Sequence, residues 1–356
     1  MAIAGTEQVI RQLVENTDPE RFECSIMCID GKIGELGQLL ADNGFKLHTL
    51  ARKPSGLDFN VIKQLKQFVK DNNIDVLHCH QYTPYIYGLF SSFGTKAKVI
   101  FTEHGRFYPD SYKWKRMLLN PFLSLFTDHI TAISKATAEA LIKYENFPRR
   151  KVQVIYNGIN VNTENFKDNG SLRKELNIAE DTKVLGTISR LDPIKNQPMM
   201  IEAFAEVLKT NPNTILLIVG DGPERNKLET LCQTLNIEGK VIFTGFKVNP
   251  QRYFNIIDIF LLSSLSEGTS MTLLEAMAFK KPAVVTDVGG NPEIVVDGVT
   301  GLITQTNNPK LFSGSIAELL QSENTYKYLS EKCYIRYLDE FSVQRMIKEY
   351  VSKYLK

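Results

Sequence analysis

In the stretch Ser266-Glu267-Gly268-Thr269-Ser270-Met271-Thr272-Leu273-Leu274-Glu275-Ala276-Met277-Ala278, two glutamates stand eight positions apart. The apolar run at 256–262 predicts a strand of a parallel sheet, 263–270 predicts a loop, and the periodicity from Thr272 onward predicts a helix. One acid therefore lies on the loop and the other in the first turns of the helix. Open α/β sheets bind ligands beyond the carboxyl ends of their strands, where helix N-termini offer N–H groups to anions.

The same stretch also has a simpler interpretation. Thr272 and Glu275 fit the S/T-x-x-E capping box, which only starts a helix. On this stretch alone the two interpretations are equally supported. The neighbouring segments decide between them.

Two further predicted strands end in polar segments. The strand at 184–189 leads into Arg190 and Lys195, and the strand at 282–286 leads into 287–293, which opens another helix. Because parallel strands present their carboxyl ends at one edge of a sheet, the three strand ends are expected to converge. That layout suits a phosphate-bearing, hydroxyl-rich ligand.

At these residues the chain resembles the GT-B glycosyltransferases, specifically the retaining family 4 enzymes that use nucleotide sugars. The matching segments follow the family's order and are Glu103-His104-Gly105, Tyr156-Asn157-Gly158-Ile159, Arg190 with Lys195, Gly220-Asp221-Gly222-Pro223-Glu224, Glu267 with Glu275, and Gly289-Gly290 with Glu293. The similarity covers nearly the whole chain and is strongest from 151 to 301. The joint pattern is far more specific than any single motif.

This resemblance implies how the donor is bound. Arg190 offers a planar fork of donors and Lys195 a compact charge, so together they would neutralise the departing diphosphate in place of a divalent metal. Glu275 would accept hydrogen bonds from the ribose, and Glu267 would hold a hydroxyl of the transferred sugar. We therefore expect no metal and no cofactor, with a nucleotide sugar, by default a UDP-sugar, as co-substrate.

Other donor contacts are expected from glycines and from a helix start. Gly220 and Gly268 permit close approach of the ligand, although a tight turn explains Gly220 as well. The N–H groups of 270–273 add donors for the diphosphate. The residues predicted to bind the nucleotide sugar are Gly5, Gly220, Pro223, Phe246, Gly268, Ser270, Met271, Thr272, Leu273 and Glu275.

The first half would contribute His104, which follows the strand predicted at 97–102 and matches the family histidine that reaches the donor sugar. The predicted catalytic residues are His104, Arg190, Lys195 and Glu267. In the family reaction the leaving phosphate takes the acceptor proton on the same face of the sugar. The anomeric configuration is then retained without a protein nucleophile.

The first half also departs from the family pattern. The expected Gly-Gly-x-Glu loop is here Ala4-Gly5-Thr6-Glu7, with only Met1-Ala2-Ile3 before it, so the first strand is expected to be missing. That strand is central in a doubly wound sheet, and its loss leaves neighbouring backbone groups unpaired. Turnover should suffer more than donor binding.

Length and composition limit the possible architectures and partners. With 356 residues, two domains are the natural expectation. The chain has 42 basic and 40 acidic residues, so its net charge does not indicate a nucleic-acid partner. Five scattered cysteines without a C-x-x-C pair favour reduced thiols in the cytoplasm. No apolar stretch is long enough to span a membrane, and no signal-peptide core is present. We expect a cytoplasmic protein, with contact to the inner face of the membrane left open.

The predicted fold class is α/β: a GT-B architecture of two doubly wound Rossmann-like domains facing a central cleft. Strands are predicted at 22–29, 74–79, 97–102, 128–133 and 152–156, then at 183–189, 214–219, 240–243, 257–262, 283–286 and 301–303, with helices such as 58–72 and 112–126 between them. The polar stretch 160–181 predicts a linker. The domains are expected at 1–159 and 160–340, with a terminal helix at 341–356 returning to the first.

Two segments keep a second interpretation. His78-Cys79-His80 resembles a set of metal ligands, but alternate strand residues face opposite sides, which argues against zinc. The aromatic and basic residues at 106–108 and 112–122 fit either core packing with solvated lysines or a membrane surface.

The expected function is transfer of a hexosyl-type sugar to a glycan or lipid-linked acceptor, as in cell-envelope polysaccharide synthesis. Two alternatives share the donor site. One is a nucleotide-sugar epimerase of the same fold, and the other is a nucleotide-sugar-binding subunit that regulates a partner. Product analysis separates all three.

Overall fold

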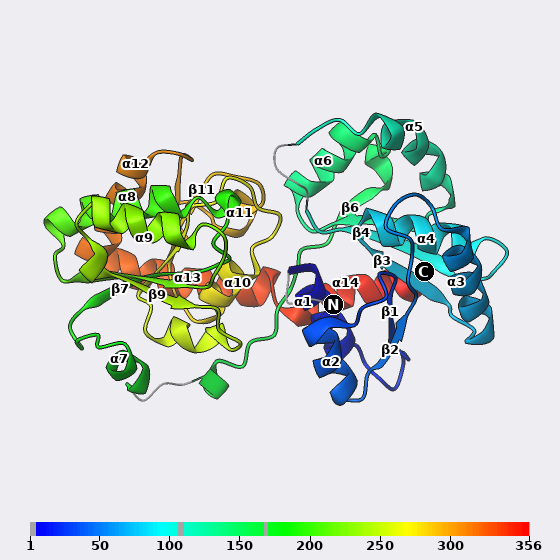
Figure 1. Ribbon diagram of the computed structural model, residues 1–356, viewed down its shortest axis with the longest axis horizontal. Coiled ribbons are helices and arrows are strands. Elements are labelled where there is room, and N and C mark those ends of the chain that lie inside the picture. Colours follow the sequence, from blue (N-terminus) through cyan, green and yellow to red (C-terminus); the bar gives the residue numbers. More distant parts are fainter. Residues whose placement is uncertain (1–4, 106–109, 167–169, 356) are drawn as a thin grey trace. The chain divides into compact units, whose positions relative to one another are not determined.

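The computed structural model describes residues 5–105, 110–166 and 170–355 (Figure 1). It divides into two compact units. Unit 1 comprises 1–159 and 342–356, and unit 2 comprises 160–341. The segment 106–108 and Ala4, both named above, lie outside the described residues.

Unit 2 is built on one parallel sheet of six strands in the order β12-β11-β10-β7-β8-β9. The strands are β7 (Lys183–Ile188), β8 (Thr214–Val219), β9 (Val241–Gly245), β10 (Ile259–Leu262), β11 (Ala283–Thr286) and β12 (Leu302–Thr304). Every residue of the inner strand β8, between β7 and β9, is buried, as a continuous apolar run predicts. Strand order reverses between β7 and β10, which places a crevice at their carboxyl ends.

Helices cover both faces of this sheet. They are α7 (Ser171–Glu175), α8 (Gln197–Thr210), α9 (Arg225–Thr234), α10 (Met271–Ala278), α11 (Asn291–Ile294), α12 (Pro309–Gln321) and α13 (Glu323–Glu340), with short 3₁₀ turns η3 (Thr163–Phe166), η4 (Pro193–Lys195), η5 (Glu238–Lys240) and η6 (Pro250–Asn255). Ile259 and Leu261 of β10 belong to a core cluster with side chains of α8, α9 and α12. Phe260, which points the other way, packs against Phe254 of η6 at a centroid distance of 5.7 Å.

Unit 1 contains two parallel sheets, β1-β2 and β3-β4-β5-β6. The strands are β1 (Ser25–Cys28), β2 (Lys46–Thr49), β3 (Val76–His80), β4 (Lys98–Glu103), β5 (His129–Ala132) and β6 (Val152–Val154). The helices are α1 (Gly5–Asn16), α2 (Gly34–Asp42), α3 (Phe59–Asp71), α4 (Tyr82–Ser92), α5 (Trp114–Leu123), α6 (Lys135–Glu145) and α14 (Val343–Leu355), with 3₁₀ turns η1 (Ser124–Phe126) and η2 (Arg149–Lys151).

The two sheets of unit 1 share helices although no strand joins them among the described residues. Met27 and Ile29, at β1, belong to one hydrophobic cluster with Val61 of α3 and Tyr87 of α4. Among the described strands, β1 pairs with β2 alone and β3 with β4 alone. The break falls where a doubly wound sheet would place its first strand, and the first described element is helix α1.

The prediction of an α/β protein with two Rossmann-like units is confirmed. One strand, β2, was not predicted, because its sequence Lys-Leu-His-Thr is polar and its burial is only partial. The helix predicted at 112–126 is two elements, α5 and η1. The terminal helix α14 belongs to unit 1, where the N–H of Gly158 points at the Met346 sulfur at 3.2 Å.

Candidate active site

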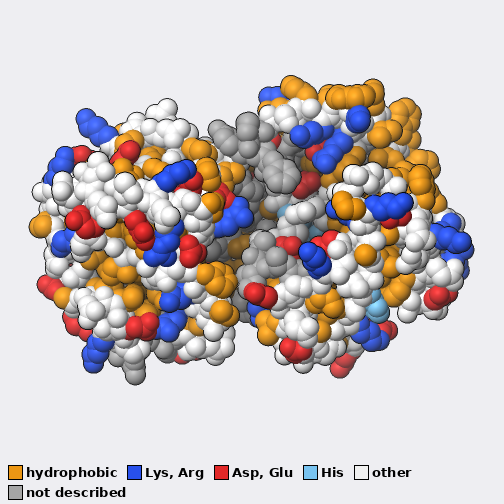
Figure 2. All heavy atoms as spheres, viewed as in Figure 1, with side chains coloured by type: hydrophobic (Ala, Val, Ile, Leu, Met, Phe, Trp, Pro, Cys, Tyr) orange, Lys and Arg blue, Asp and Glu red, His pale blue; other side chains and the backbone are white. Residues whose placement is uncertain are grey.

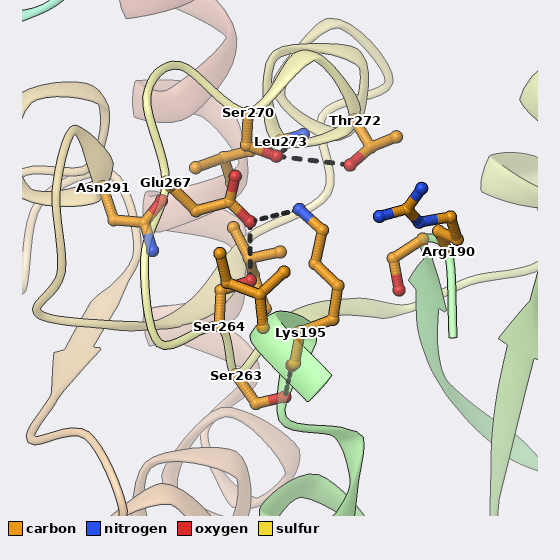
Figure 3. A network of polar contacts seen from close by, with 12 residues as sticks. Arg190, Lys195, Ser263, Ser264, Glu267, Ser270, Thr272, Leu273 and Asn291 are labelled. Atoms are coloured by element: carbon orange, nitrogen blue, oxygen red, sulfur yellow. Dashed lines mark hydrogen bonds and ion pairs between the residues drawn. The ribbon is translucent and has the colours of Figure 1, made fainter. Parts of the chain in front are cut away.

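The carboxyl ends of β7 and β10 carry an ion pair between Lys195 and Glu267. The Lys195 ammonium lies 2.6 Å from Glu267 Oε1, and the Ser264 hydroxyl donates to the same oxygen at 2.6 Å (Figure 3). The Glu267 side chain is 9% exposed and that of Lys195 is 24% exposed. Because both charges are largely withdrawn from water, removing either side chain would leave the other charge buried without a counter-charge.

Hydrogen bonds fix the two loops that carry this pair. The 3₁₀ turn η4 ends at Lys195 and is capped by Asp192, whose carboxylate accepts from the Ile194 N–H at 3.0 Å. The Leu265 N–H donates to the Ile194 carbonyl at 2.8 Å, and the Ser263 hydroxyl donates to the Lys195 carbonyl at 2.9 Å. The ion pair therefore joins loops that are already tied together through backbone atoms.

Glycines allow these loops to approach closely. A Cβ atom on Gly220, where φ is +139°, would lie 2.0 Å from the Ser189 carbonyl oxygen, and one on Gly222 would lie 2.2 Å from that of Leu191. A Cβ atom on Gly289 would lie 1.9 Å from the Glu267 carbonyl oxygen. The convergence of the strand ends is thus observed. At Gly220 the closest approach is to the chain's own backbone, which favours the turn interpretation.

Helix α10 begins at Met271 with Ser270 as its N-cap. The Ser270 hydroxyl accepts from the Leu273 N–H at 3.3 Å, so the capping box of Thr272 and Glu275 considered from the sequence is wrong. Thr272 instead lies in the first turn of the helix. The N–H groups of Met271 and Thr272 have no intrahelical acceptor, because a helix leaves its first N–H groups unsatisfied. They remain suited to an anion.

Glu275 is half-buried and accepts a hydrogen bond from Gln251 Nε2 at 2.8 Å. Burial raises the pKa of Glu275 to about 7, and the hydrogen bond from Gln251 opposes this rise. The carboxyl group therefore changes charge close to neutral pH. Because Ser270 is the N-cap, Glu275 is not part of a capping box with Thr272. The role of Glu275 toward a ligand stays a prediction.

Arg190 lies at the end of β7 with its side chain 73% exposed and forms an ion pair with Asp192. The carbonyl of Arg190 accepts a hydrogen bond from Gln197 Nε2 at 2.9 Å. This bond holds the backbone of Arg190 and does not involve its guanidinium group. Figure 3 shows Arg190 and Lys195 in the same close-up, with Glu267 at the far end of the Lys195 side chain.

The remaining predicted donor residues of unit 2 lie on loops at the strand ends. Gly268 is half-buried in the loop between β10 and α10, and Pro223 is exposed just before α9. Phe246 follows β9 and is 59% exposed. These positions are compatible with a ligand-facing role, which stays a prediction.

Unit 1 holds a pair of histidines at the ends of adjacent strands. His80 ends β3 and His104 follows β4, and His80 Nδ1 lies 2.7 Å from His104 Nε2. Burial lowers the pKa of His80 to about 3 and the pKa of His104 well below its usual value, so both rings are neutral at pH 7. His104 Nδ1 is buried and has no hydrogen-bond partner among the described residues. Gly5 begins α1 in the same unit.

The motif His78-Cys79-His80 is used for packing and hydrogen bonding. His78 Nε2 lies 2.7 Å from the Thr102 hydroxyl and His78 Nδ1 lies 2.9 Å from the Tyr354 hydroxyl. Cys79 faces the other side, in a core cluster with Tyr85. Within the described ranges, no three His, Cys, Asp or Glu side chains gather into a group that would hold a metal ion.

Four polar residues near the predicted site residues were not themselves predicted as site residues: Ser264, Gln251 and Asn291 in unit 2, and His80 in unit 1. Ser264 and Gln251 contact the two glutamates, and His80 contacts His104. Asn291 is fully buried and donates to the Thr286 carbonyl at 3.0 Å, whereas its Oδ1 has no partner among the described residues. Each lies at a strand end or on a neighbouring turn, but none has a spacing that marks it.

Two family profiles match the chain in succession. The profile described as Glycosyltransferase Family 4 matches residues 3–163, and the profile described as Glycosyl transferases group 1 matches residues 168–336. Full-length relatives are also similar. The N-acetyl-alpha-D-glucosaminyl L-malate synthase of Bacillus anthracis is 27% identical over 91% of this chain and 93% of its own. The UDP-Gal:alpha-D-GlcNAc-diphosphoundecaprenol alpha-1,3-galactosyltransferase of Escherichia coli is 24% identical over 99% and 94%.

Solved structures share the fold. A glycosyltransferase from Rickettsia africae superposes with a TM-score of 0.87 at 18% identity, covering 99% of this chain and 96% of that one. Anabaena HepE in complex with UDP superposes with a TM-score of 0.86 at 21% identity, covering 98% and 95%. Within the described part of this chain, no helix has both the length and the apolar character needed to cross a bilayer.

Proposed function

We propose, from the premise that this chain belongs to the family 4 glycosyltransferases of the GT-B fold, that it transfers a hexosyl-type sugar from a UDP-sugar to a glycan or lipid-linked acceptor with retention of configuration. The observation that carries the proposal is the Lys195–Glu267 pair at the ends of β7 and β10, 2.6 Å apart and largely buried. It offers a cation for a leaving diphosphate and a carboxylate for a sugar hydroxyl on neighbouring loops.

The diphosphate would bind where positive charge is already arranged. Lys195 is held by Glu267 and donates further N–H groups, and Arg190, which follows the same strand β7, has an exposed guanidinium. The first N–H groups of α10 add donors directed along the helix axis. Because these donors are placed before the reaction, negative charge that develops on the leaving group meets little reorganisation cost. We therefore propose that the side chains neutralise this charge without a divalent metal.

The nucleoside and sugar would be held by the two glutamates. Glu275, half-buried beside Gln251, is proposed to accept hydrogen bonds from the ribose hydroxyls. Glu267, already hydrogen-bonded by Ser264, is proposed to accept from a hydroxyl of the transferred sugar. Removing the hydroxyl partner from such a buried acceptor is costly, which makes these contacts selective for polyhydroxylated ligands.

Retention follows if the chemistry occurs on one face of the sugar. The bond between the anomeric carbon and the diphosphate oxygen breaks, and the acceptor hydroxyl oxygen bonds to the same face. The acceptor proton passes to the departing phosphate oxygen. His104, a neutral imidazole at the end of β4, is proposed to orient a sugar or acceptor hydroxyl.

Relatives support the acceptor class. The Escherichia coli relative is named for an acceptor on diphosphoundecaprenol, and a Campylobacter jejuni relative, 29% identical over 71% of this chain, for a diphospho-undecaprenol acceptor. The Bacillus anthracis relative is named for L-malate. We propose a lipid-linked or glycan acceptor for this chain, with a small hydroxy acid as the comparison substrate.

A donor screen with product analysis tests the proposal. Purified protein is incubated with UDP-, GDP- and ADP-sugars and with each acceptor class, and the glycosidic configuration of the product is read from the anomeric proton coupling. The expected result is UDP release with an α-linked product from an α-linked donor. An inverted linkage contradicts retention. Release of a free epimerised nucleotide sugar indicates an epimerase, and UDP binding without any turnover indicates a regulatory subunit.

A further inference from the structure

Helix α5 and turn η1 expose their apolar side chains and bury polar ones. Six large apolar side chains on residues 114–126 are more than half exposed: Trp114 65%, Leu118 64%, Leu119 55%, Phe122 68%, Leu125 63% and Phe126 59%. The residues that face inward include Asn120 and Ser124, both fully buried, and Arg116, which is half-buried. A surface helix of a protein in water shows the opposite polarity.

Specific hydrogen bonds hold α5 in this orientation. Arg116 forms an ion pair with Glu145 at 2.8 Å. The Asn120 amide donates to the Glu145 carbonyl at 2.8 Å, and its carbonyl oxygen accepts from the Tyr82 hydroxyl at 2.8 Å. Turning the apolar side inward would break these bonds and leave buried polar atoms unpaired. The exposure of the apolar side is therefore built into the packing of unit 1.

The exposed side chains continue onto neighbouring elements. Phe126 packs edge-on against Phe93, just after α4, at a centroid distance of 5.4 Å. A groove of about 370 Å³ lies beside Leu119 and is lined by Leu57, Ile86 and Phe90. We define the outer patch as the large exposed apolar residues of this region: Leu57, Phe93, Trp114, Leu118, Leu119, Phe122, Leu125 and Phe126. Figure 2 shows hydrophobic side chains gathered over α5 and the adjoining α4, with Lys and Arg side chains at their border.

The charged side chains of α5 and of the residue before it are all basic. Residues 111–127 contain Lys113, Lys115 and Arg116 and no Asp or Glu. The Arg116 charge is balanced by Glu145, whereas Lys113 and Lys115 are exposed at the start of α5. Tyr112 and Trp114, which are 61% and 65% exposed, flank Lys113. Aromatic rings with a polar atom and lysines beside an apolar helix face are typical of contact with an anionic membrane surface.

We infer that the outer patch binds the surface of an anionic lipid bilayer. The apolar side chains of α5 and η1 enter the boundary between headgroups and acyl chains, and Lys113 and Lys115 contact lipid phosphates. The short helix lies in the plane of the interface and does not span it. This surface lies outside the donor site and explains how unit 1 would work on an acceptor anchored in a membrane.

Flotation with lipid vesicles tests this inference without any need for activity. Full-length protein is mixed with vesicles of phosphatidylcholine alone or of equal parts phosphatidylcholine and phosphatidylglycerol. Wild-type protein should float with the anionic vesicles, and Leu118→Gln/Phe122→Gln should reduce the partition coefficient at least about tenfold. Lys113→Glu/Lys115→Glu should remove the part of binding that salt weakens.

The matched control is Leu338→Gln, because Leu338 is an exposed apolar residue of α13, 48% exposed, outside the outer patch. It should float like wild type. Circular dichroism and UDP binding should be the same for all variants, since the substituted side chains are exposed and lie outside the donor site. Equal flotation of wild type and the Leu118/Phe122 variant overturns the inference. So does a wild-type dimer that this variant converts to monomer without any lipid binding, which would assign the patch to a second copy.

Discussion

Each unit carries a largely buried polar pair at the ends of two adjacent parallel strands, and these two pairs differ in charge. In unit 2, Lys195 after β7 and Glu267 after β10 form an ion pair. In unit 1, His80 at the end of β3 and His104 after β4 form a hydrogen bond between neutral rings. In the proposed function, the charged pair would serve the diphosphate and the uncharged pair a sugar hydroxyl.

The difference has a physical basis. A diphosphate is stabilised by fixed cations, which must themselves be balanced when the ligand is absent, and Glu267 supplies that balance for Lys195. A hydroxyl group needs only a directional partner, and a neutral imidazole avoids the cost of burying a charge. Four experiments test this contrast between the charged pair and the neutral one.

The charged pair should tolerate substitution least. Lys195→Ala removes the cation that is proposed to face the leaving group and leaves the largely buried Glu267 with its hydrogen bond from Ser264. We expect kcat/KM to fall by about 10²–10³-fold, or roughly 3–4 kcal/mol of transition-state stabilisation. Steady-state kinetics with the donor found in the screen measure this. Lys195→Arg keeps the charge and should recover part of the loss, whereas unchanged kinetics in Lys195→Ala would remove Lys195 from the site.

The close backbone contact between the ends of β8 and β7, the strand that leads to Lys195, should be the next most sensitive feature. Gly220→Ala places a Cβ atom 2.0 Å from the Ser189 carbonyl oxygen at a φ of +139°. We expect the free energy of unfolding to fall by about 2–3 kcal/mol, measured by urea denaturation. The control is Gly314→Ala within α12, where a Cβ atom meets nothing within 4 Å. That variant should be neutral or more stable by up to about 1 kcal/mol. Similar losses in both variants would contradict the tight loop packing.

The neutral pair should affect turnover more than binding. His104→Ala should lower kcat by about 10–100-fold while the Kd for UDP is unchanged, because positioning and proton handling contribute in this range. His80→Ala should give a smaller loss in kcat, since His80 is proposed to act by holding the ring of His104. Calorimetric titration with UDP separates the two effects. A weaker UDP affinity in His104→Ala, equal to that of Lys195→Ala, would erase the distinction between the pairs.

The pH dependence of donor affinity should give the smallest effect. The raised pKa of Glu275, about 7, means that the carboxylate available to ribose hydroxyls is lost as pH falls through neutrality. UDP affinity should therefore rise from pH 6 to pH 8, by at most about tenfold per unit below the pKa. Glu275→Gln should flatten the profile. In the empty protein the sign is opposite: ionising the buried carboxyl is unfavourable, so its contribution to stability falls as pH rises from 4.5 to about 7.

Strand positions were readable from the sequence where burial is complete. The strand predicted at 214–219 is β8 without a shift at either end, because a short, continuous apolar run rich in β-branched residues is typical of a strand buried on both faces. The short strand β2 escaped prediction, because its exposed edge keeps polar residues. The start of α10 was displaced by one residue, because Ser270 and Thr272 both have a side chain that can cap a helix.

The sequence predicted where the candidate site residues lie along the chain, but it did not predict which side chains they contact. Strand and turn signals placed Lys195, Glu267 and His104 at strand ends, and the structure finds them there. Their partners Ser264 and His80 carry no spacing signal, because each contact bridges elements that only the folded loops and the sheet order make neighbours.

The sequence by itself determined two α/β units and put the chemically active side chains on the loops after their strands, because periodicity and turn residues act over short distances along the chain. Tertiary structure alone decided that Lys195 pairs with Glu267, that His80 pairs with His104, and that α5 turns its apolar side outward. Those outcomes depend on which strands lie side by side and on which buried polar atoms find partners, and neither is local in the sequence.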